Sequence, residues 1–511
     1  MSRYILALDQ GTTSSRAILF DRGGSPIATG QRELPQHYPH LSWVEHDPEE
    51  IWETQIQAAK EAIAKAGASA DDIEAIGIAN QRETTLLWDR RTGIPVYPAI
   101  VWQDRRTSDR CEELKAQGLE NTYIARTGLL FDSYFSATKI EWILNNVRNA
   151  RKRAEAGELA FGTVDSYLIW RLTGGKVHAT DLTNASRTLI FHIDMLDWSE
   201  KLMSFLDLPK GILADIVPST GIIGYTDPEI FGKPIPIAGV AGDQQAALYG
   251  QAGFRPGVAK ATYGTGCFLL RHIGEQAVIS ENRILTTPVA CTDIENASYA
   301  FEGSVFNAGS AIQWLRDGLG ILSSADESEA VARTVKDNEG VYMVPAFTGL
   351  GAPYWDPDAR AAIVGLTRGS TRAHVVRAAL ESIAYQCKDV LEAMDEECEV
   401  PLRELRVDGG ASRNDFLMQF QANILGIPVV RPKVTETTAL GAAYLAGLAV
   451  GFWSSEEELE SLWKIDRRFE PEMDESERES LHFMWQEAVG QVRVSSPDFD
   501  VDEDELGDDW A

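Results

Sequence analysis

Two short segments combine glycine with hydroxyl residues, and each is a candidate for holding phosphate groups. Residues 11–15 (Gly-Thr-Thr-Ser-Ser) follow an apolar run at 4–9, and residues 264–266 (Gly-Thr-Gly) follow another at 258–263. Glycine lets backbone N–H groups turn inward, the hydroxyls add donors, and a concave row of amides attracts anions. Each segment alone is also typical of a plain polar turn. Two such turns across one cleft would grip a polyphosphate from both sides.

Charged residues flank the first of these turns. Asp9 ends the apolar run before the turn and is placed to hold a hydrated Mg²⁺, which prefers oxygen ligands. Arg16 follows the turn and can neutralise charge on a transferring phosphoryl group. The segment therefore predicts phosphoryl-transfer chemistry.

Asp243 is the candidate for a general base. It lies between a predicted buried strand at 235–241 and a predicted helix at 244–249. An acid at the carboxyl end of a strand lies where α/β proteins place their ligands. There it could accept a proton from a substrate hydroxyl that attacks phosphorus. The alternative is a helix N-cap, where Asp is favoured, although Gly242 leaves room for a ligand.

Arg82 and Glu83 follow a predicted strand at 73–79 in the same way. The arginine offers a rigid fork of donors and the glutamate offers acceptors, so the pair can clamp adjacent hydroxyls of a polyol. Trp102 and Phe268 could wall off the carbon backbone of such a molecule. A surface salt bridge and ordinary core aromatics are the alternatives.

A further polar turn, Asp408-Gly409-Gly410, precedes a helix predicted from about 412 to 425. Small residues before a helix allow a ligand to approach closely, and Asn414 can read a polar edge of a base or ribose. A Gly-Gly pair is also common in left-handed turns.

The P-loop, protein-kinase and Rossmann motifs are absent from the sequence.

The elements that would position these residues alternate between strand and helix. Strands are predicted at residues 4–9, 16–20, 73–79, 84–88, 161–164 and 235–241, and helices at 48–66, 167–172 and 244–249. After residue 250 the pattern restarts with a strand, a Gly/Thr turn and a strand over 258–270, followed by a strand at 405–407. This order predicts an α/β architecture of two similar halves with a cleft between them and a boundary near 250–257.

The composition of the 511 residues excludes several classes of protein. Hydrophobic residues make up 44% and charged residues 24%, which is ordinary for a globular protein. The net charge of −30 repels phosphate backbones and anionic membranes, so we expect no nucleic-acid partner. No apolar run reaches the ~18 residues of a membrane span, so no membrane insertion is expected. The five Cys form no C-x-x-C pair, which favours reduced thiols in a cytoplasm.

The charged residues carry a second signal. Of the 47 basic residues 14 are Lys and 33 are Arg, and the segment 495–511 is strongly acidic. An acidic, lysine-poor surface is a feature of halophilic proteins, in which salt screens self-repulsion. We therefore hypothesise a high-salt cytoplasm. A merely acidic mesophilic protein is the alternative.

Five segments together resemble a known family: residues 8–16, 80–85, 242–247, 263–268 and 408–411. In them the chain resembles the FGGY carbohydrate kinases, and the resemblance runs from about residue 3 to about 490. It implies an α/β protein of two actin/hexokinase-like (ribonuclease H-like) domains, with mixed sheets flanked by helices and a catalytic cleft between them. The expected domains are residues 1–252 with the acceptor site and first phosphate hairpin, 253–494 with the nucleotide site, and an acidic tail at 495–511 that is expected to be disordered.

Within this family, residues 81–85 and 242–245 are similar to those of members that phosphorylate glycerol rather than a pentulose or gluconate. The resemblance implies transfer from ATP with Mg²⁺, and family members commonly form homodimers or homotetramers. The implied glycerol contacts are Arg82, Glu83, Tyr134, Asp243 (the general base) and Gln244, beside the aromatic walls Trp102 and Phe268. The implied ATP contacts are Thr12, Thr13, Ser14, Arg16, Thr265, Gly309, Gln313, Gly410 and Asn414, with Mg²⁺ near Asp9 and Asp243.

Two other functions fit parts of the same pattern. One is a kinase of this family that acts on another small acceptor, such as dihydroxyacetone or a pentulose. The other is a non-catalytic nucleotide switch on the same fold. The combination of Arg82, Glu83 and Asp243 argues against the switch, which has no need of a diol clamp.

Overall fold

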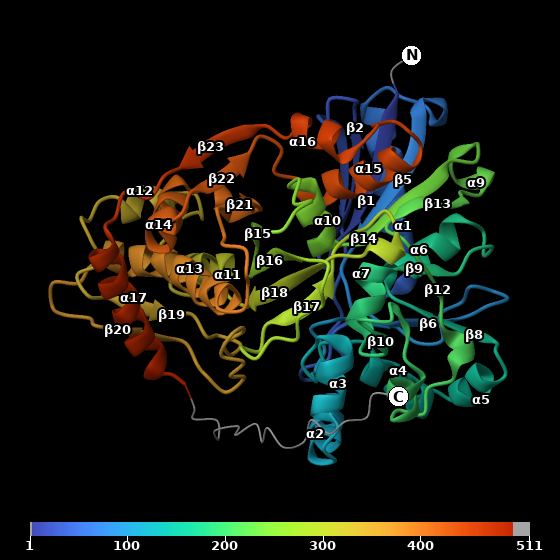
Figure 1. Ribbon diagram of the computed structural model, residues 1–511, viewed down its shortest axis with the longest axis horizontal. Helices are drawn as coiled ribbons and strands as arrows, with labels where there is room; N and C mark the ends of the chain where they lie inside the picture. Colours follow the sequence, from blue (N-terminus) through green and yellow to red (C-terminus); the bar gives the residue numbers. More distant parts are fainter. Residues whose placement is uncertain (1–2, 494–511) are drawn as a thin grey trace.

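The computed structural model describes residues 3–493 (Figure 1). They form two parts, each built around a mixed β-sheet, and we call the part with the six-stranded sheet the first and the part with the seven-stranded sheet the second. The first sheet has the order β13 (Thr220–Tyr225), β14 (Pro236–Gly242), β5 (Ile73–Asn80), β1 (Tyr4–Gln10), β2 (Ser14–Phe20), β3 (Pro26–Glu33). The second has the order β17 (Leu285–Pro288), β18 (Tyr299–Val305), β16 (Cys267–Gly274), β15 (Val258–Tyr263), β21 (Glu404–Asp408), β22 (Val429–Pro432), β23 (Ile465–Phe469).

The two sheets repeat one pairing pattern. β1 is antiparallel to β2 and parallel to β5, and β14 continues the parallel part beyond β5. Likewise β15 is antiparallel to β16 and parallel to β21, and β22 continues beyond β21. The predicted pair of similar α/β halves, each opening with a hairpin whose turn is glycine and hydroxyl residues, is therefore confirmed.

Helices cover both faces of the first sheet. In β1, Leu6 and Leu8 belong to the hydrophobic cluster of helix α1 (Pro48–Lys65), whereas Ile5 and Ala7 belong to the cluster of helix α15 (Thr437–Ala449). Side chains of a strand alternate between faces, so the two helices lie on opposite sides. A strand buried on both faces needs a nearly continuous apolar run, which is what residues 4–8 provide.

The second sheet packs against α13 (Arg372–Asp395) and α14 (Asp415–Leu425). The other helices are α2 (Ser108–Ala116), α3 (Glu120–Thr127), α4 (Ala137–Asn146), α5 (Ala150–Glu155), α6 (Val164–Leu172), α7 (Leu182–Ala185), α8 (Glu200–Ser204), α9 (Pro228–Phe231), α10 (Asp243–Gly250), α11 (Gly309–Asp317), α12 (Glu327–Ala332), α16 (Glu456–Leu462) and α17 (Glu475–Gly490). Short strand pairs are β4 (Glu45–His46) with β7 (Ala99–Ile100), β6 (Leu86–Asp89) with β8 (Leu159–Gly162), β9 (Ala179–Asp181) with β12 (Asp215–Val217), β10 (Phe191–His192) with β11 (Asp197–Trp198), and β19 (Tyr342–Val344) with β20 (Ala362–Val364).

Helix α15 joins the two parts. It comes late in the chain, yet it lies against the first sheet, where its orange-red ribbon crosses the blue strands in Figure 1. It also packs closely on α10: a Cβ on Gly441 would lie 1.8 Å from the Ala246 carbonyl oxygen, and one on Gly250 would lie 2.0 Å from that of Thr437. The domain boundaries at 252 and 253 stay a prediction, and the predicted tail at 495–511 lies outside the described residues.

Three predicted elements differ in detail. The strand predicted at 84–88 is β6, which pairs with β8 instead of extending the main sheet. The strand predicted at 161–164 ends at Gly162, because Val164 begins α6. The helix predicted from 412 begins at Asp415, since the Asn414 side chain caps it by accepting a hydrogen bond from Leu417 N at 2.9 Å.

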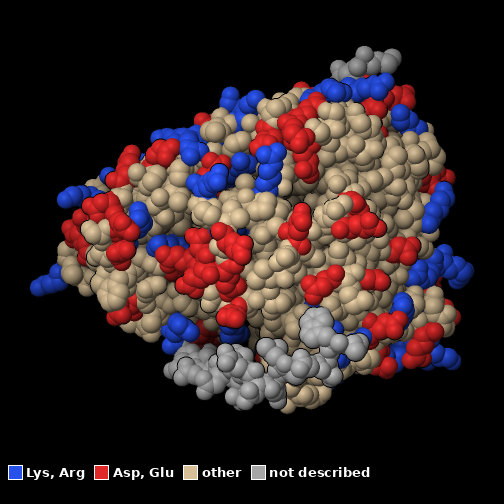
Figure 2. All heavy atoms as spheres, in the orientation of Figure 1, with Lys and Arg blue, Asp and Glu red and all other residues tan. Residues whose placement is uncertain are grey.

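The surface agrees with the acidic composition. Figure 2 shows several patches of Asp and Glu on one face, with Lys and Arg mostly toward the edge of the view. All five cysteines are free thiols. Within residues 3–493, no helix has the length and apolar character needed to cross a membrane.

Candidate active site

Trp102 contacts the first glycine–hydroxyl turn and the strand that follows the second. Its Nε1 donates a hydrogen bond to Thr12 Oγ1 in the first turn at 2.9 Å. Its ring meets that of Phe268, just after the second turn, at a centroid distance of 6.4 Å. Trp102 thus connects the first turn with the strand that follows the second turn. That the two turns face each other across one cleft stays a prediction.

The second turn is tied to the start of helix α11. Gly264 O accepts a hydrogen bond from Gly309 N at 3.0 Å, and Thr265 O accepts one from Ser310 N at the same distance. A Cβ at Gly309 would lie 2.5 Å from Gly264 O, so only glycine allows this approach. The structure thus brings the predicted nucleotide contacts Thr265 and Gly309 together. Gln313 is exposed farther along α11.

The glycine turn after β21 lies beside the same hairpin. Gly409 has a φ of 83°, and a Cβ there would lie 2.5 Å from Tyr263 O. The next residue, Gly410, is exposed with open space at its Cβ position. Asn414 is less available than the sequence suggests: besides capping α14, its Nδ2 donates to Ser328 Oγ at 3.2 Å.

In the first turn Thr13 is exposed, Thr12 and Ser14 are half-buried, and the two flanking charges have close neighbours. Arg16 forms an ion pair with Glu436, the residue before α15. A phosphate group would therefore meet Arg16 beside a competing carboxylate. Burial raises the pKa of the Asp9 carboxyl to about 7, Arg16 opposes the shift, and the negative charges of Glu436 and Asp243 add to it.

Asp9 and Asp243 are the two carboxylates that the sequence predicts for Mg²⁺. Among residues 3–493, no cluster of three or more His, Cys, Asp or Glu side chains is built to hold a metal by itself. The two aspartates are near enough for Asp243 to raise the pKa of Asp9. Mg²⁺ is commonly held by one or two carboxylates together with substrate phosphates and water, so this donor pair fits it.

Arg82 and Asp243 face each other on the acceptor side of the cleft. Arg82 Nε lies 3.2 Å from Asp243 Oδ1, and the Asp243 side chain keeps 29% of its surface exposed. Burial raises the pKa of Asp243, while the cations Arg82 and Lys260 oppose the rise. Asp243 is the first residue of α10, whose N-cap is Gly242. It is thus an accessible, hydrogen-bond-competent carboxylate that follows a buried strand.

The space that Gly242 leaves open is filled by Arg82. A Cβ at Gly242 would lie 2.6 Å from Arg82 Cδ and 2.7 Å from its Cγ. The expectation that this glycine makes room for a ligand is therefore wrong in detail, because the arginine side chain itself occupies the position. Gly242 still serves the site, since it lets Arg82 reach Asp243.

Glu83 is almost fully buried and has a φ of 60°, a left-handed conformation that is strained for a residue with a side chain. Its Oε1 accepts from Arg187 Nε at 2.6 Å, whereas Arg82 Nε is 3.9 Å away. Gln244 is also buried, and its Oε1 accepts from Lys260 Nζ. Both predicted acceptor contacts are thus held in place by cations that the sequence reasoning missed.

The predicted aromatic walls line one small cavity. Trp102 meets Tyr134 edge-on at a centroid distance of 5.6 Å, and with Phe268 these rings border a space of about 40 Å³. The second part of the chain contributes Ser304, Phe306 and Trp355 to the lining. Gln103, Arg105 and Asp132 of the first part complete it. This combination of aromatic rings and polar groups suits a small polyol, whose carbon chain is apolar and whose hydroxyls need partners.

Lys260, Arg187 and Glu302 are the charged residues that the sequence analysis overlooked. All three are fully buried beside the predicted acceptor contacts. A signal was present for two of them, because Lys260 and Glu302 interrupt runs of small and apolar residues that read as buried strands. Charged residues are almost never fully buried unless paired, so each interruption indicates a partner elsewhere in the fold.

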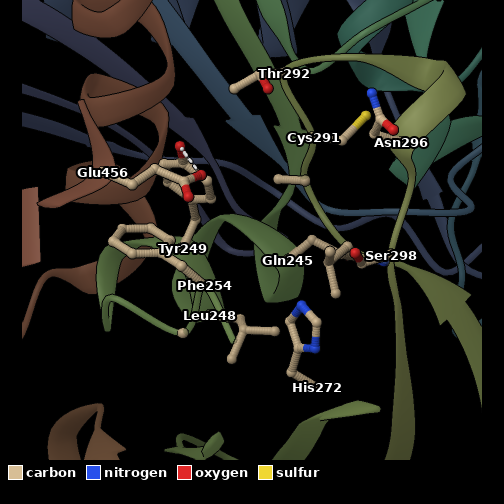
Figure 3. A pocket seen from close by; sticks show the side chains of 13 residues that line it. Gln245, Leu248, Tyr249, Phe254, His272, Cys291, Thr292, Asn296, Ser298 and Glu456 are labelled. Atoms are coloured by element: carbon tan, nitrogen blue, oxygen red, sulfur yellow. Dashed lines mark hydrogen bonds between the residues drawn. The ribbon is translucent and has the colours of Figure 1, made fainter. Parts of the chain in front are cut away.

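A second cavity, of about 170 Å³, lies farther along α10 (Figure 3). Gln245, Leu248 and Tyr249 of that helix border it, opposite His272 of β16. Tyr249 donates to Glu456 Oε1 at 2.9 Å at its edge. None of the predicted site residues lines this cavity, so it is separate from the cleft described above.

Comparisons with known proteins agree with this geometry. The models of the N-terminal and C-terminal domains of the FGGY family of carbohydrate kinases match residues 4–250 and 259–450. The chain is 59% identical to glycerol kinase 2 of Thermotoga maritima over 95% of this chain and 98% of that one. It is 60% identical to a glycerol kinase of Caldanaerobacter subterraneus over 96% of this chain and 98% of that one.

Solved structures show the same likeness. The glycerol kinase of Plasmodium falciparum with ADP has a TM-score of 0.90 and 36% identity, covering 97% of this chain and 99% of that one. A xylulose kinase of Lactobacillus acidophilus has a TM-score of 0.86 at 23% identity, covering 96% and 98%, which shows a common fold. The expected architecture of two actin/hexokinase-like domains is thereby confirmed. The chain belongs to the FGGY family of carbohydrate kinases.

Proposed function

We propose that this protein transfers the γ-phosphoryl group of ATP to a terminal hydroxyl of glycerol, giving sn-glycerol 3-phosphate and ADP. The observation that carries the proposal is the contact between Arg82 Nε and Asp243 Oδ1 at 3.2 Å, which joins a predicted acceptor contact to the predicted general base. High identity to glycerol kinases over nearly the whole chain, and likeness to one solved with ADP, support the acceptor and the nucleotide.

In this proposal Asp243 acts as the general base. Its carboxylate accepts the proton of the terminal hydroxyl while the oxygen forms a bond to the γ-phosphorus. The bond from that phosphorus to the β–γ bridging oxygen breaks, and ADP leaves. Because burial raises the pKa of Asp243, the carboxylate is a stronger base than a solvated aspartate. Arg82 and Glu83 bind the other hydroxyls, with Tyr134 and Gln244 beside them.

The turns at 11–15 and 264–266 hold the phosphates by backbone and hydroxyl donors, with Arg16 supplying positive charge. Gly309, Gln313, Gly410 and Asn414 are proposed for the nucleoside end. Asp9 and Asp243 would hold Mg²⁺, which neutralises charge on the phosphates. Closure of the two parts excludes water, so that ATP is not hydrolysed wastefully.

We further propose that the protein works in a reducing cytoplasm, where its free thiols persist. The homodimer or homotetramer common in the family remains a prediction for this chain.

Coupled ADP-release assays with and without glycerol test the function, at low and at molar KCl. We expect ADP formation to require glycerol and the product to be glycerol 3-phosphate. ADP formation that is independent of glycerol would contradict the proposal. A higher kcat/KM with dihydroxyacetone or a pentulose than with glycerol would assign a different acceptor.

A further inference from the structure

Strand β18, in the second part of the chain, reaches the acceptor side of the cleft. Ser304 pairs with Phe268 of β16, one of the aromatic walls, and Glu302 lies two residues earlier. Residues two apart in a strand point to the same face. β18 therefore presents a carboxylate and a hydroxyl toward residues of the first part.

Glu302 binds two arginines of the first part at once. Its Oε2 accepts from Arg82 Nη1 at 2.5 Å, and its Oε1 accepts from Arg82 Nη2 at 2.8 Å and from Arg187 Nη2 at 3.1 Å. The paired contact fixes the plane of the Arg82 guanidinium, whose Nε faces Asp243. Arg187 and Arg82 lower the pKa of Glu302 to about 2 against the effect of burial.

Arg187 extends this arrangement to the other polyol contacts. Its Nε holds Glu83, and its guanidinium carbon lies 5.7 Å from the centre of the Tyr134 ring. One carboxylate of the second part thus orients Arg82 directly and Glu83 through Arg187. Opening of the two parts would remove Glu302 and release both side chains.

Ser304 has a hydroxyl that is buried without a hydrogen-bond partner among residues 3–493. Only 3% of the residue is exposed, and it lines the 40 Å³ cavity with Trp102, Tyr134 and Phe268. A buried hydroxyl left unpaired is costly, so such a group calls for an explanation. A hydroxyl of the bound acceptor would satisfy it.

We propose that β18 completes the acceptor site, with Ser304 Oγ binding an acceptor hydroxyl and Glu302 acting as a positioning residue for Arg82 and Arg187. This inference rests on the proposed function and extends it. The acceptor site is then formed by residues of both parts of the chain.

Deoxy analogues test the Ser304 contact. Propane-1,2-diol lacks one terminal hydroxyl of glycerol and propane-1,3-diol lacks the middle one. We expect Ser304→Ala to lower kcat/KM for glycerol by about tenfold. For the diol that lacks the hydroxyl bound by Ser304, the same substitution should change kcat/KM by no more than about twofold, because Ser304 makes no hydrogen bond to that diol. An equal loss of kcat/KM for all three acceptors, or no loss for any of them, would overturn the Ser304 assignment. Ser382→Ala removes a buried hydroxyl on α13 and is the matched control.

Steady-state kinetics test the role of Glu302. We expect Glu302→Gln to raise the glycerol KM by about tenfold or more while the ATP KM stays within about twofold. Glu302→Asp should recover part of the glycerol affinity. Glu381→Gln also neutralises a buried carboxylate, one paired with Arg377 at 2.6 Å, and should leave both KM values unchanged. If the ATP KM rises as much as the glycerol KM, Glu302 has a general structural role and the assignment is wrong.

If Glu302→Gln does not fold, Arg187→Lys takes its place, with the same selective rise in the glycerol KM expected. Failure of the proposed function is separable from failure of this inference. A wild-type protein that makes no ADP with glycerol contradicts the function. A wild-type protein that is active, with Ser304→Ala and Glu302→Gln kinetically unchanged, contradicts the role of β18 alone.

Discussion

The indole Nε1 of Trp102 donates a hydrogen bond of 2.9 Å to Oγ1 of Thr12, which joins an acceptor wall to a phosphate turn. Thr12 sits in the turn proposed for ATP, and Trp102 borders the cavity proposed for glycerol. A movement of Trp102 should therefore displace Thr12, and a movement of Thr12 should displace Trp102. We therefore expect the contact to align the two proposed substrates for in-line transfer.

A double-mutant cycle measures this coupling. Thr12→Val removes the hydroxyl and nearly keeps the side-chain shape. Trp102→Phe removes the indole N–H and keeps an aromatic ring, although a smaller one. We expect each to lower kcat/KM for glycerol, and the double variant to lose less than the sum by about 0.5–1.5 kcal/mol. Strict additivity would show that the hydrogen bond does not align the substrates.

Asp243→Asn tests the general base. Asparagine keeps the shape of the side chain but accepts no proton, so kcat should fall by about 10²–10⁴-fold. Asp227→Asn, at the N-cap of α9, is the control and should keep wild-type kcat, since Asn is an equally good cap. Circular dichroism checks folding. A variant at position 243 that retains most of its kcat would disprove the assignment.

The raised pKa of Asp9 predicts a pH effect on the protein free of nucleotide and Mg²⁺. The pKa of Asp9 is about 7 in the folded state against an ordinary 3.8, so the folded state binds more protons between these pH values. Stability should then fall as pH rises from about 4 to about 7. Thermal unfolding of wild type and Asp9→Asn from pH 5 to 8 checks this. The variant should lose less stability than wild type over that range. If the unfolding midpoints of the two proteins fall in parallel with pH, the raised pKa of Asp9 is refuted.

Close packing of α10 on α15 makes Gly441 sensitive to substitution. A Cβ there would meet Ala246 O at 1.8 Å, which backbone atoms cannot accommodate without moving. Gly441→Ala should therefore lower the free energy of unfolding by about 1–3 kcal/mol or more in urea titrations. Gly490→Ala has open space at its Cβ and should be neutral or slightly stabilising. If the two variants change the free energy of unfolding by similar amounts, tight packing of α10 on α15 is not the cause of the loss.

The net charge of −30 predicts a salt effect. If the chain is adapted to a high-salt cytoplasm, molar KCl should raise its unfolding midpoint above that in dilute buffer by screening self-repulsion. Potassium chloride suits this test because it stabilises proteins less by exclusion than sulfate does. Midpoints that do not differ between the two buffers would refute the halophile hypothesis.

The candidate site residues could be predicted where their signal is local. Asp9, Asp243 and the pair Arg82–Glu83 each follow an apolar run that forms a strand, and strand ends are where α/β folds bind ligands. Glycine and hydroxyl residues between two apolar runs likewise predict both hairpin turns. Asn414 shows the limit of this reasoning, because the same side chain that suits a ligand also suits a helix cap.

The partners of those residues could not be predicted, because they come from distant parts of the chain. Glu302 meets Arg82 across 220 residues, and Glu436 meets Arg16 across 420. The filling of the space at Gly242 by Arg82 is of the same kind. Such pairings depend on how the two sheets are placed together, and no periodicity or motif records that placement.

By itself the amino-acid sequence determined the α/β class, the two similar halves and the candidate residues of the site, since hydrophobic alternation and turn residues act over a few positions. Only the tertiary structure decided which charges neutralise one another inside the protein. A buried charge is tolerated only where the folded chain brings an opposite charge to it. That requirement joins Lys260, Arg187 and Glu302 to residues far away in sequence, and it places charges of both halves around the proposed acceptor site.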